Sequence, residues 1–123
     1  MAKKKILVAD DDSGIVDAMQ ILLEDEGYDV ITTMNGENIR DMYEQKPDLV
    51  FLDIWMSGIN GSTICQKLKA DEKTSNVPVI MFSANRDTHD IAKQCGADGF
   101  LSKPFEIKEL LQIVNRFLGE PTA

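Results

Sequence analysis

The chain alternates between two hydrophobic patterns, one typical of buried strands and one of amphipathic helices. Short aliphatic runs such as KILVA suit strands that are buried on both faces. Between them apolar residues recur at helical spacing, as in SGIVDAMQILLEDEG, where Gly27 is typical of a helix end. These patterns predict strands at 5–9, 28–33, 48–53, 77–84 and 99–102, and helices at 13–27, 36–45, 61–71, 88–96 and 106–119. The expected inward face of the last helix consists of Ile107, Leu110, Leu111, Val114 and Phe117 or Leu118.

Five strands that alternate with five helices predict a (βα)5 fold. Such alternation is typical of a parallel sheet covered by helices on both faces. We expect the doubly wound, flavodoxin-like α/β sandwich, whose five-stranded parallel sheet has the order 2-1-3-4-5. In this class, ligands bind beyond the carboxyl ends of the strands, between the first and third strands. No linker-like segment interrupts the 123 residues, so we expect a single domain, 1–123.

Composition narrows the class of protein. The chain is 43% hydrophobic and 28% charged, as is usual for a globular protein. Its 13 basic and 21 acidic residues give a net charge of −8, which argues against a general nucleic-acid surface. No apolar stretch approaches the roughly 20 residues of a membrane span, and the apolar run near the start is too short for a signal peptide. We therefore expect a cytoplasmic protein that contacts neither nucleic acid nor membrane directly.

The two cysteines offer no metal-ligand pattern. Cys65 and Cys95 lie 30 positions apart and form neither a CxxC pair nor a Cys/His cluster. We interpret them as small, semi-buried thiols in a reducing compartment.

Polar residues follow the ends of the predicted strands. The first strand ends in the aspartates 10–12, the third in Asp53 and the fourth in Ser83, and Lys103-Pro104 follows the fifth. Because parallel strands end at the same edge of a sheet, these side chains should converge. Two carboxylates about 4 Å apart repel by roughly 4 kcal/mol at an effective dielectric constant of 20. Mg²⁺, which prefers oxygen ligands, and a lysine would offset that repulsion and suit phosphoryl transfer to a carboxylate.

Four segments resemble the hallmark segments of response regulator receiver domains: ILVADDD, DLVFLDIWM…G, VIMFSA and GADGFLSKPF. The resemblance extends from Lys4 to Leu118, with the motifs in the family's order and spacing. It implies that Asp53 is the phosphoacceptor. It also implies that Asp10 and Asp11 hold Mg²⁺, Asp11 directly and Asp10 through water, and that the backbone carbonyl of Trp55 is a further ligand.

The resemblance also implies a phosphate-binding and switching group. Ser83 would be the switch hydroxyl, with Ala84 beside it, and Lys103 would bind the phosphoryl group. The bond between Lys103 and Pro104 would be a cis peptide. Phe100 would change rotamer on activation, although a strand phenylalanine is also an ordinary core residue, so both roles stay open.

The implied function is a phosphorylation-dependent signalling switch that is not an enzyme. A sensor histidine kinase or phosphotransfer protein would donate the phosphoryl group, and the face formed by helix 4, strand 5 and helix 5 would then bind a target or output domain. The state would be a monomer or a phosphorylation-dependent dimer. The alternative is a degenerate receiver that binds partners without phosphorylation.

Two other classes fit the residues less well. An aspartyl phosphatase would need a second carboxylate two residues after Asp53, where Trp55 stands. A flavodoxin-like electron carrier would need a hydroxyl-rich phosphate loop after the first strand, where three aspartates would repel a flavin phosphate.

Two positions depart from the family pattern, and one position has a separate structural role. Ser57 stands where the family usually has proline, which favours a less rigid loop. Ile113 stands where receivers of winged-helix transcription factors typically carry arginine, so their charged dimer interface is not implied. Asp12 and Ser13 are expected to cap the first helix.

Overall fold

The structure is a computed structural model that describes residues 3–34, 44–56, 59–83 and 88–119. Most of the helix expected at 36–45 lies outside the described residues, as do Ser57 and Ala84.

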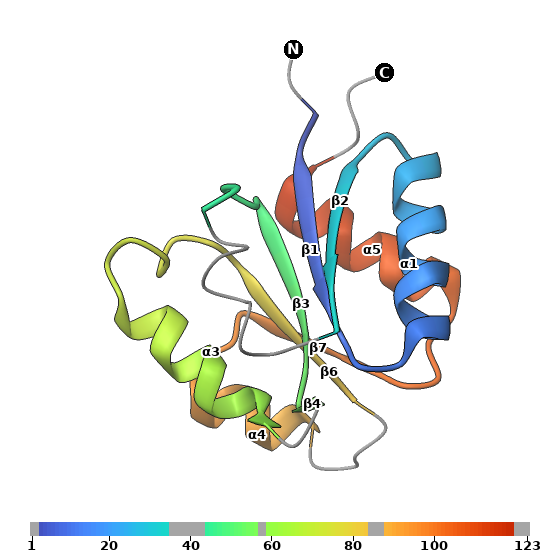
Figure 1. Cartoon of the computed structure of the whole chain (residues 1–123). Helices are drawn as coiled ribbons and strands as arrows, with labels where there is room; N and C mark the ends of the chain where they lie inside the picture. The colour runs from blue at the N-terminus through green and yellow to red at the C-terminus, as the bar shows by residue number, and fades with distance from the viewer. Residues whose placement is uncertain (1–2, 35–43, 57–58, 84–87, 120–123) are drawn as a thin grey trace.

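A five-stranded parallel sheet forms the centre of the molecule, in the order β2-β1-β3-β6-β7 (Figure 1). Counted along the chain, this is the predicted order 2-1-3-4-5, so the predicted fold class is confirmed. The strands are β1 Lys5–Ala9, β2 Asp29–Thr33, β3 Leu49–Asp53, β6 Val79–Ser83 and β7 Gly99–Ser102. All side chains of the central strands β3 and β6 are buried, which explains their uninterrupted apolar sequence.

Helices cover both faces of the sheet. In Figure 1, α1 and α5 lie on one side and α3 and α4 on the other. Their bounds are α1 Ser13–Asp25, α3 Gly61–Ala70, α4 Thr88–Cys95 and α5 Ile107–Leu118. Two apolar clusters, one per face, form the core. Among the described residues, no helix is both long enough and apolar enough to cross a membrane.

Helix ends explain several sequence features. Asp12 is the N-cap of α1 and accepts hydrogen bonds from the backbone N–H groups of Gly14 and Ile15. Ser13 is instead the first residue of the helix. Gly27 follows α1 with φ of 99°, a conformation that glycine adopts without strain.

Two details differ from the sequence-based expectations. Ile107 was expected to face inward, but it is 54% exposed because it begins α5, ahead of the buried Leu110. A short antiparallel ladder, β4 Trp55–Met56 with β5 Ile59–Asn60, follows β3 and was not predicted. Its two-residue strands are too short to produce a hydrophobic period.

Candidate functional site

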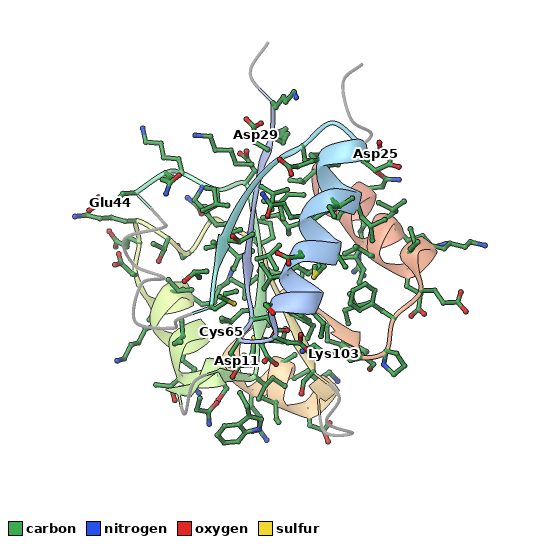
Figure 2. The ribbon with its side chains drawn as sticks, turned by 45° about the vertical axis from the view of Figure 1, so that its right-hand side comes forward. Asp11, Asp25, Asp29, Glu44, Cys65 and Lys103 are labelled. Carbon is green, nitrogen blue, oxygen red and sulfur yellow. The ribbon has the colours of Figure 1, made fainter. Side chains whose placement is uncertain are left out.

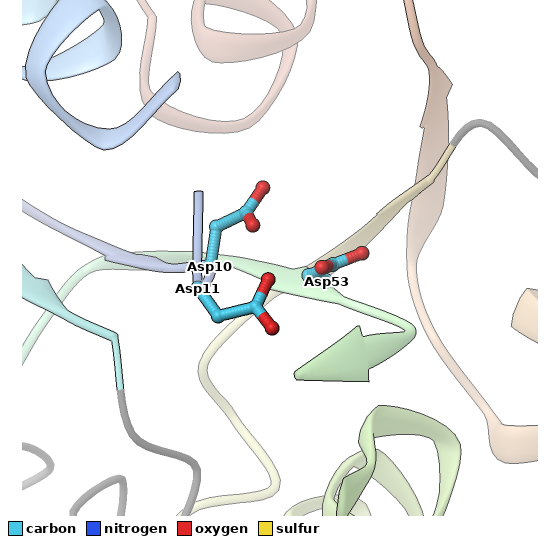
Figure 3. Close-up of side chains that lie close together, drawn as sticks. All are labelled: Asp10, Asp11 and Asp53. Carbon is cyan, nitrogen blue, oxygen red and sulfur yellow. The ribbon is translucent and has the colours of Figure 1, made fainter. Parts of the chain in front are cut away.

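Three carboxylates converge at the carboxyl end of the sheet (Figure 3). One oxygen from each of Asp10, Asp11 and Asp53 lies within 4.8 Å of the others, and we call these residues the carboxylate cluster. Asp10 is fully buried and Asp53 is 5% exposed, whereas Asp11 is open to solvent. Figure 3 shows the Asp11 carboxylate turned toward Asp53.

The strand register produces this convergence. Ala9 of β1 pairs with Leu52 of β3, so the residues that follow them, Asp10 and Asp53, emerge side by side. The backbone N–H of Asp10 donates to the Thr33 carbonyl oxygen, at 3.1 Å, which continues the β1–β2 pairing. The position of the cluster therefore follows from the backbone, and its repulsion has to be offset by its surroundings.

Lys103 supplies part of that compensation, and Figure 2 labels it at the same end of the molecule as Asp11. Its Nζ lies 2.6 Å from Oδ2 of Asp10 and 3.7 Å from Oδ1 of Asp53, and its side chain is 15% exposed. The ammonium also lies over the Phe82 ring, 4.7 Å from its centroid. We expected Lys103 at this edge from the sequence. In the structure its ammonium lies closer to Asp10 than to Asp53. The peptide bond from Lys103 to Pro104 is cis, as expected.

The surroundings of Asp53 disfavour its charged form. Burial raises the pKa of this carboxyl from 3.8 to about 6, and the neighbouring Asp10 adds to the rise. Lys103 and a hydrogen bond from the Trp55 backbone act in the opposite direction. At neutral pH Asp53 is therefore still mainly a carboxylate, but one whose charge is costly to keep.

The remaining predicted site residues lie near this edge. Ser83 ends β6, is 7% exposed, and accepts a hydrogen bond from the Lys103 backbone at its carbonyl oxygen, at 3.0 Å. Ser83 also pairs with Ser102 of β7. The Phe100 side chain on β7 is 41% exposed, so it is not a core residue in this structure. Trp55 is 56% exposed, directly after the segment that carries Asp53.

Two site-shaping residues were not found from the sequence. The N-terminus of α3 approaches Asp53 so closely that a Cβ on Gly61 would collide with the Asp53 carbonyl oxygen. Asn60 caps α3 by accepting a hydrogen bond from the Ser62 N–H, at 2.9 Å. An Asn-Gly pair is a common turn signal, and here it marks a close backbone approach. Only the folded chain shows that Asp53 is what it approaches.

Charge balance is the main property of the site. Within the described part of the chain, three clustered carboxylates face one ammonium group. The excess negative charge favours a bound cation, and the oxygen donors suit a hard one such as Mg²⁺.

Comparison with known proteins identifies the family. Residues 6–115 match the response regulator receiver domain family. The chain therefore belongs to the response regulator receiver domain family, as the four sequence motifs predicted.

Three relatives illustrate the range of that family. The DNA-binding dual master transcriptional regulator RpaA of Synechocystis sp. is 38% identical over 117 residues, which are 93% of this chain and 48% of RpaA. The chain thus spans about half the length of the curated relatives that it matches. Chemotaxis protein CheY4 of Vibrio cholerae is 26% identical with a TM-score of 0.85, covering 95% of this chain and all of the other.

The third relative was solved with a metal ion. The receiver domain of sensor histidine kinase PA1611 from Pseudomonas aeruginosa is 26% identical, with a TM-score of 0.85 over 97% of this chain and all of the other. That structure has a magnesium ion coordinated in the active site cleft.

Proposed function

We propose that this chain is a phosphorylation-dependent signalling switch in which Asp53 accepts a phosphoryl group. The observation that carries the proposal is the placement of Asp53: a nearly buried carboxylate, clustered with Asp10 and Asp11 and within 3.7 Å of the Lys103 ammonium. Family membership supports the same role.

The carboxylate cluster fits Mg²⁺. Asp11 and Asp53 are the candidate direct ligands because the Asp11 carboxylate is exposed and turned toward Asp53 (Figure 3). Asp10 already accepts hydrogen bonds from the Lys103 ammonium and from the Asp12 backbone N–H, at 2.6 and 2.9 Å, so its contribution would be through water. The Trp55 backbone carbonyl is the further proposed ligand. When bound, the ion would neutralise charge on the carboxylates and on the incoming phosphoryl oxygens.

The chain's own residues would carry out the transfer. An Asp53 oxygen attacks the phosphorus of a phosphohistidine, the new O–P bond forms, and the N–P bond to the imidazole breaks. The imidazole nitrogen keeps the electron pair and takes a proton. Because the pKa of Asp53 is about 6, the attacking carboxylate is ionised at neutral pH and strongly basic for its type. Lys103 would then move its ammonium from Asp10 toward the phosphoryl oxygens.

The added charge would change the surface of the molecule. A phosphoryl group adds about −1.5 to −2 charges, which would attract the Ser83 hydroxyl and Lys103. Movement of Ser83 would leave space into which Phe100, now exposed, could turn. That rearrangement would reshape the face formed by α4, β7 and α5, where a target protein or output domain would bind.

The partners follow from this chemistry. The donor would be a sensor histidine kinase or a phosphotransfer protein in the cytoplasm. The phosphoryl group would end on the chain itself, so we propose a self-phosphorylating switch and not an enzyme that turns over a substrate. RpaA is a DNA-binding regulator, but this chain matches only half of it, so DNA would be contacted through an output domain.

The proposal is tested by incubating the reduced protein with acetyl phosphate and Mg²⁺ and measuring its intact mass. We expect the mass of one phosphoryl group to be added to the parent and none to Asp53→Asn. Asp48→Asn, at an aspartate that precedes β3 and binds the Lys5 backbone N–H, is the matched control and should be labelled like the parent. No labelling of the folded parent would favour the degenerate receiver instead.

A further inference from the structure

The two cysteines of the chain lie against one another between α3 and α4. Cys65 belongs to α3 and is fully buried, and Cys95 is the last residue of α4 and is 3% exposed. The Cys65 thiol donates a hydrogen bond to the Cys95 carbonyl oxygen, at 3.5 Å, and the Cys95 thiol donates one to the Ala92 carbonyl oxygen, at 3.4 Å. Both thiols are free. The two cysteines are therefore neighbours in the same apolar cluster, as the formation of a disulfide requires.

A pocket of about 210 Å³ borders Cys95. Its lining includes Cys95 together with Trp55, Asn60, Gln66, Ile91 and Gln94. The exposure of Trp55, Gln66 and Gln94 shows that the pocket opens at the surface. A water molecule occupies about 30 Å³ in the liquid, so a small peroxide fits inside. Cys95 is thus only 3% exposed but borders a pocket that can hold a small polar molecule.

The surroundings make the two thiols chemically different. The hydrogen bond from the Cys65 thiol lowers the pKa of Cys95, and backbone hydrogen bonds around Ala97 add to that effect. The same hydrogen bond, together with burial, raises the pKa of Cys65 above its ordinary range. A thiolate is the nucleophilic form of cysteine, and the pocket is lined by Cys95 and not by Cys65, so Cys95 is the thiol suited to attack.

We propose that Cys95 and Cys65 are an oxidisable pair that reacts with hydrogen peroxide and closes to a disulfide joining α3 to α4. The Cys95 sulfur attacks one peroxide oxygen, the O–O bond breaks, and the departing hydroxide is protonated to water, leaving a sulfenic acid. The Cys65 sulfur then attacks the Cys95 sulfur, and the S–O bond breaks to release a second water. Two thiols are oxidised by two electrons, and one peroxide is reduced to two waters.

The order of the two steps follows from access. The pocket is lined by Cys95 and not by Cys65, so peroxide meets the Cys95 sulfur first. Cys65, which is fully buried in the same apolar cluster, then attacks the oxidised sulfur from within the core.

This reaction is independent of the phosphoacceptor. Neither thiol belongs to the carboxylate cluster, and both pack in the apolar cluster between the sheet and α3 and α4. Oxidation should therefore proceed equally in Asp53→Asn, so that failure of this inference and failure of the proposed function are distinguishable.

The test treats the folded, reduced chain with a small excess of hydrogen peroxide and measures intact mass and size without reductant. We expect a monomer that has lost two hydrogen atoms and regains them with dithiothreitol. Cys65→Ser should instead gain one oxygen atom that dimedone traps, and Cys95→Ser should react at least tenfold more slowly. Cys65→Ala and Cys95→Ala, checked by circular dichroism, repeat the comparison where serine perturbs folding.

Other outcomes overturn the proposal. These are a disulfide between two chains, a parent that gains oxygen without losing hydrogen, equal reactivity of the two single variants, or a parent that reacts only when unfolded.

The route to Cys95 is tested separately. Gln94→Trp narrows the pocket and should slow peroxide oxidation of the parent pair about tenfold without changing the product. Lys93→Trp places the same ring on the adjacent exposed position of α4, which does not line the pocket, and should react at the parent rate. Equal slowing by both substitutions would contradict access through this pocket.

Discussion

Two lysine–carboxylate contacts of similar length differ in what surrounds them. Lys69 of α3 lies 2.8 Å from Asp98, and Lys103 lies 2.6 Å from Asp10. The first pair joins α3 to Asp98, which directly precedes β7, and the second pair lies at the carboxyl end of the sheet. The charges around each pair distinguish a structural ion pair from a functional site.

The pair formed by Lys69 and Asp98 is balanced. Besides Asp98, the Lys69 ammonium donates to the carbonyl oxygens of Ser75 and Val77, at 2.9 and 3.3 Å. Asp98 also accepts the backbone N–H of Val79, at 2.8 Å. One cation meets one anion, and each has further hydrogen-bond partners, so nothing more needs to bind.

Lys103 lies in an unbalanced group. It faces Asp10 and Asp53 with Asp11 close by, so three negative charges meet one positive charge. Burial, with a further contribution from Asp10, raises the pKa of Asp53 to about 6, so its negative charge is costly. A ligand that brings positive charge should stabilise this region and leave the first pair unaffected.

The largest expected effect comes from removing each lysine in turn. Lys103→Met leaves the fully buried Asp10 without its cation, which should lower the free energy of unfolding by about 3–5 kcal/mol. Lys69→Met loses hydrogen bonds at a more exposed pair and should cost about 1–3 kcal/mol. The free energy of unfolding of each variant is then measured by denaturant titration with and without Mg²⁺.

Mg²⁺ should raise the free energy of unfolding more in Lys103→Met than in the parent. Lys69→Met should respond to Mg²⁺ like the parent. An equal response of the two variants would contradict the contrast between the two lysine pairs.

The pH dependence of metal-free stability is the next test. The folded-state pKa of Asp53, about 6, is raised above the ordinary 3.8, so protonation favours the folded state. The stabilisation that comes from protonating Asp53 is fully present below the unfolded-state pKa of 3.8 and is lost as the pH rises through the folded-state pKa of about 6. In a chelator, lowering the pH from 7 to 5 should therefore raise the stability contributed by this group by about 1 kcal/mol.

Asp53→Asn isolates that contribution because it removes the titrating carboxyl. The difference in unfolding free energy between the parent and Asp53→Asn should change with pH in the direction given. A difference that is constant from pH 7 to 5 would show that the charge on Asp53 is not costly.

A smaller effect is expected at Asp11. Because this residue is exposed, Asp11→Asn should raise the metal-free free energy of unfolding by less than about 1 kcal/mol through relief of repulsion. The Mg²⁺-induced rise in melting temperature should then be lost. Asp12→Asn, which keeps the capping oxygen of α1, is the neighbouring control and should retain the rise. An equal Mg²⁺ shift in Asp11→Asn and the parent would count against ligation by Asp11.

The smallest effect concerns the lifetime of the phosphorylated state. The exposed Trp55 ring should hinder in-line approach of water to the aspartyl phosphate, so Trp55→Asn should hydrolyse severalfold faster, a change of less than about 1.4 kcal/mol in the barrier. First-order decay of the labelled protein at fixed Mg²⁺ measures this. The competing expectation concerns Asn85, which stands two positions after Ser83 and lies outside the described residues. If Asn85 already orients the water, Asn85→Ala slows decay and Trp55→Asn decays at the parent rate.

Much of the fold could be read from the sequence because its signals are local. Uninterrupted apolar runs mark strands buried on both faces, and Gly27 and Asp12 mark the ends of α1. The convergence of Asp10, Asp53 and Lys103 was predictable as well, because parallel strands end at one edge. Ile107 was misplaced because amphipathic periodicity does not show where a helix begins to contact the core.

The remaining features depend on contacts between distant segments. That Lys103 contacts Asp10 more closely than Asp53 is decided by side-chain packing, which has no sequence period. The approach of Gly61 to the Asp53 carbonyl and the contact of Cys65 with Cys95 are also tertiary. The two cysteines were interpreted only as small, semi-buried thiols, because nothing in their spacing shows that α3 and α4 bring them together; both are in fact buried.

We propose above that Asp53, within the carboxylate cluster, accepts the phosphoryl group and that Mg²⁺ is required. The test is to phosphorylate the protein with acetyl phosphate, reduce it with borohydride, and locate the resulting homoserine by tandem mass spectrometry. We expect homoserine at Asp53 alone, in the presence of Mg²⁺, and none in chelator. Homoserine at Asp10 or Asp11, or the same yield at Asp53 without Mg²⁺, would contradict it.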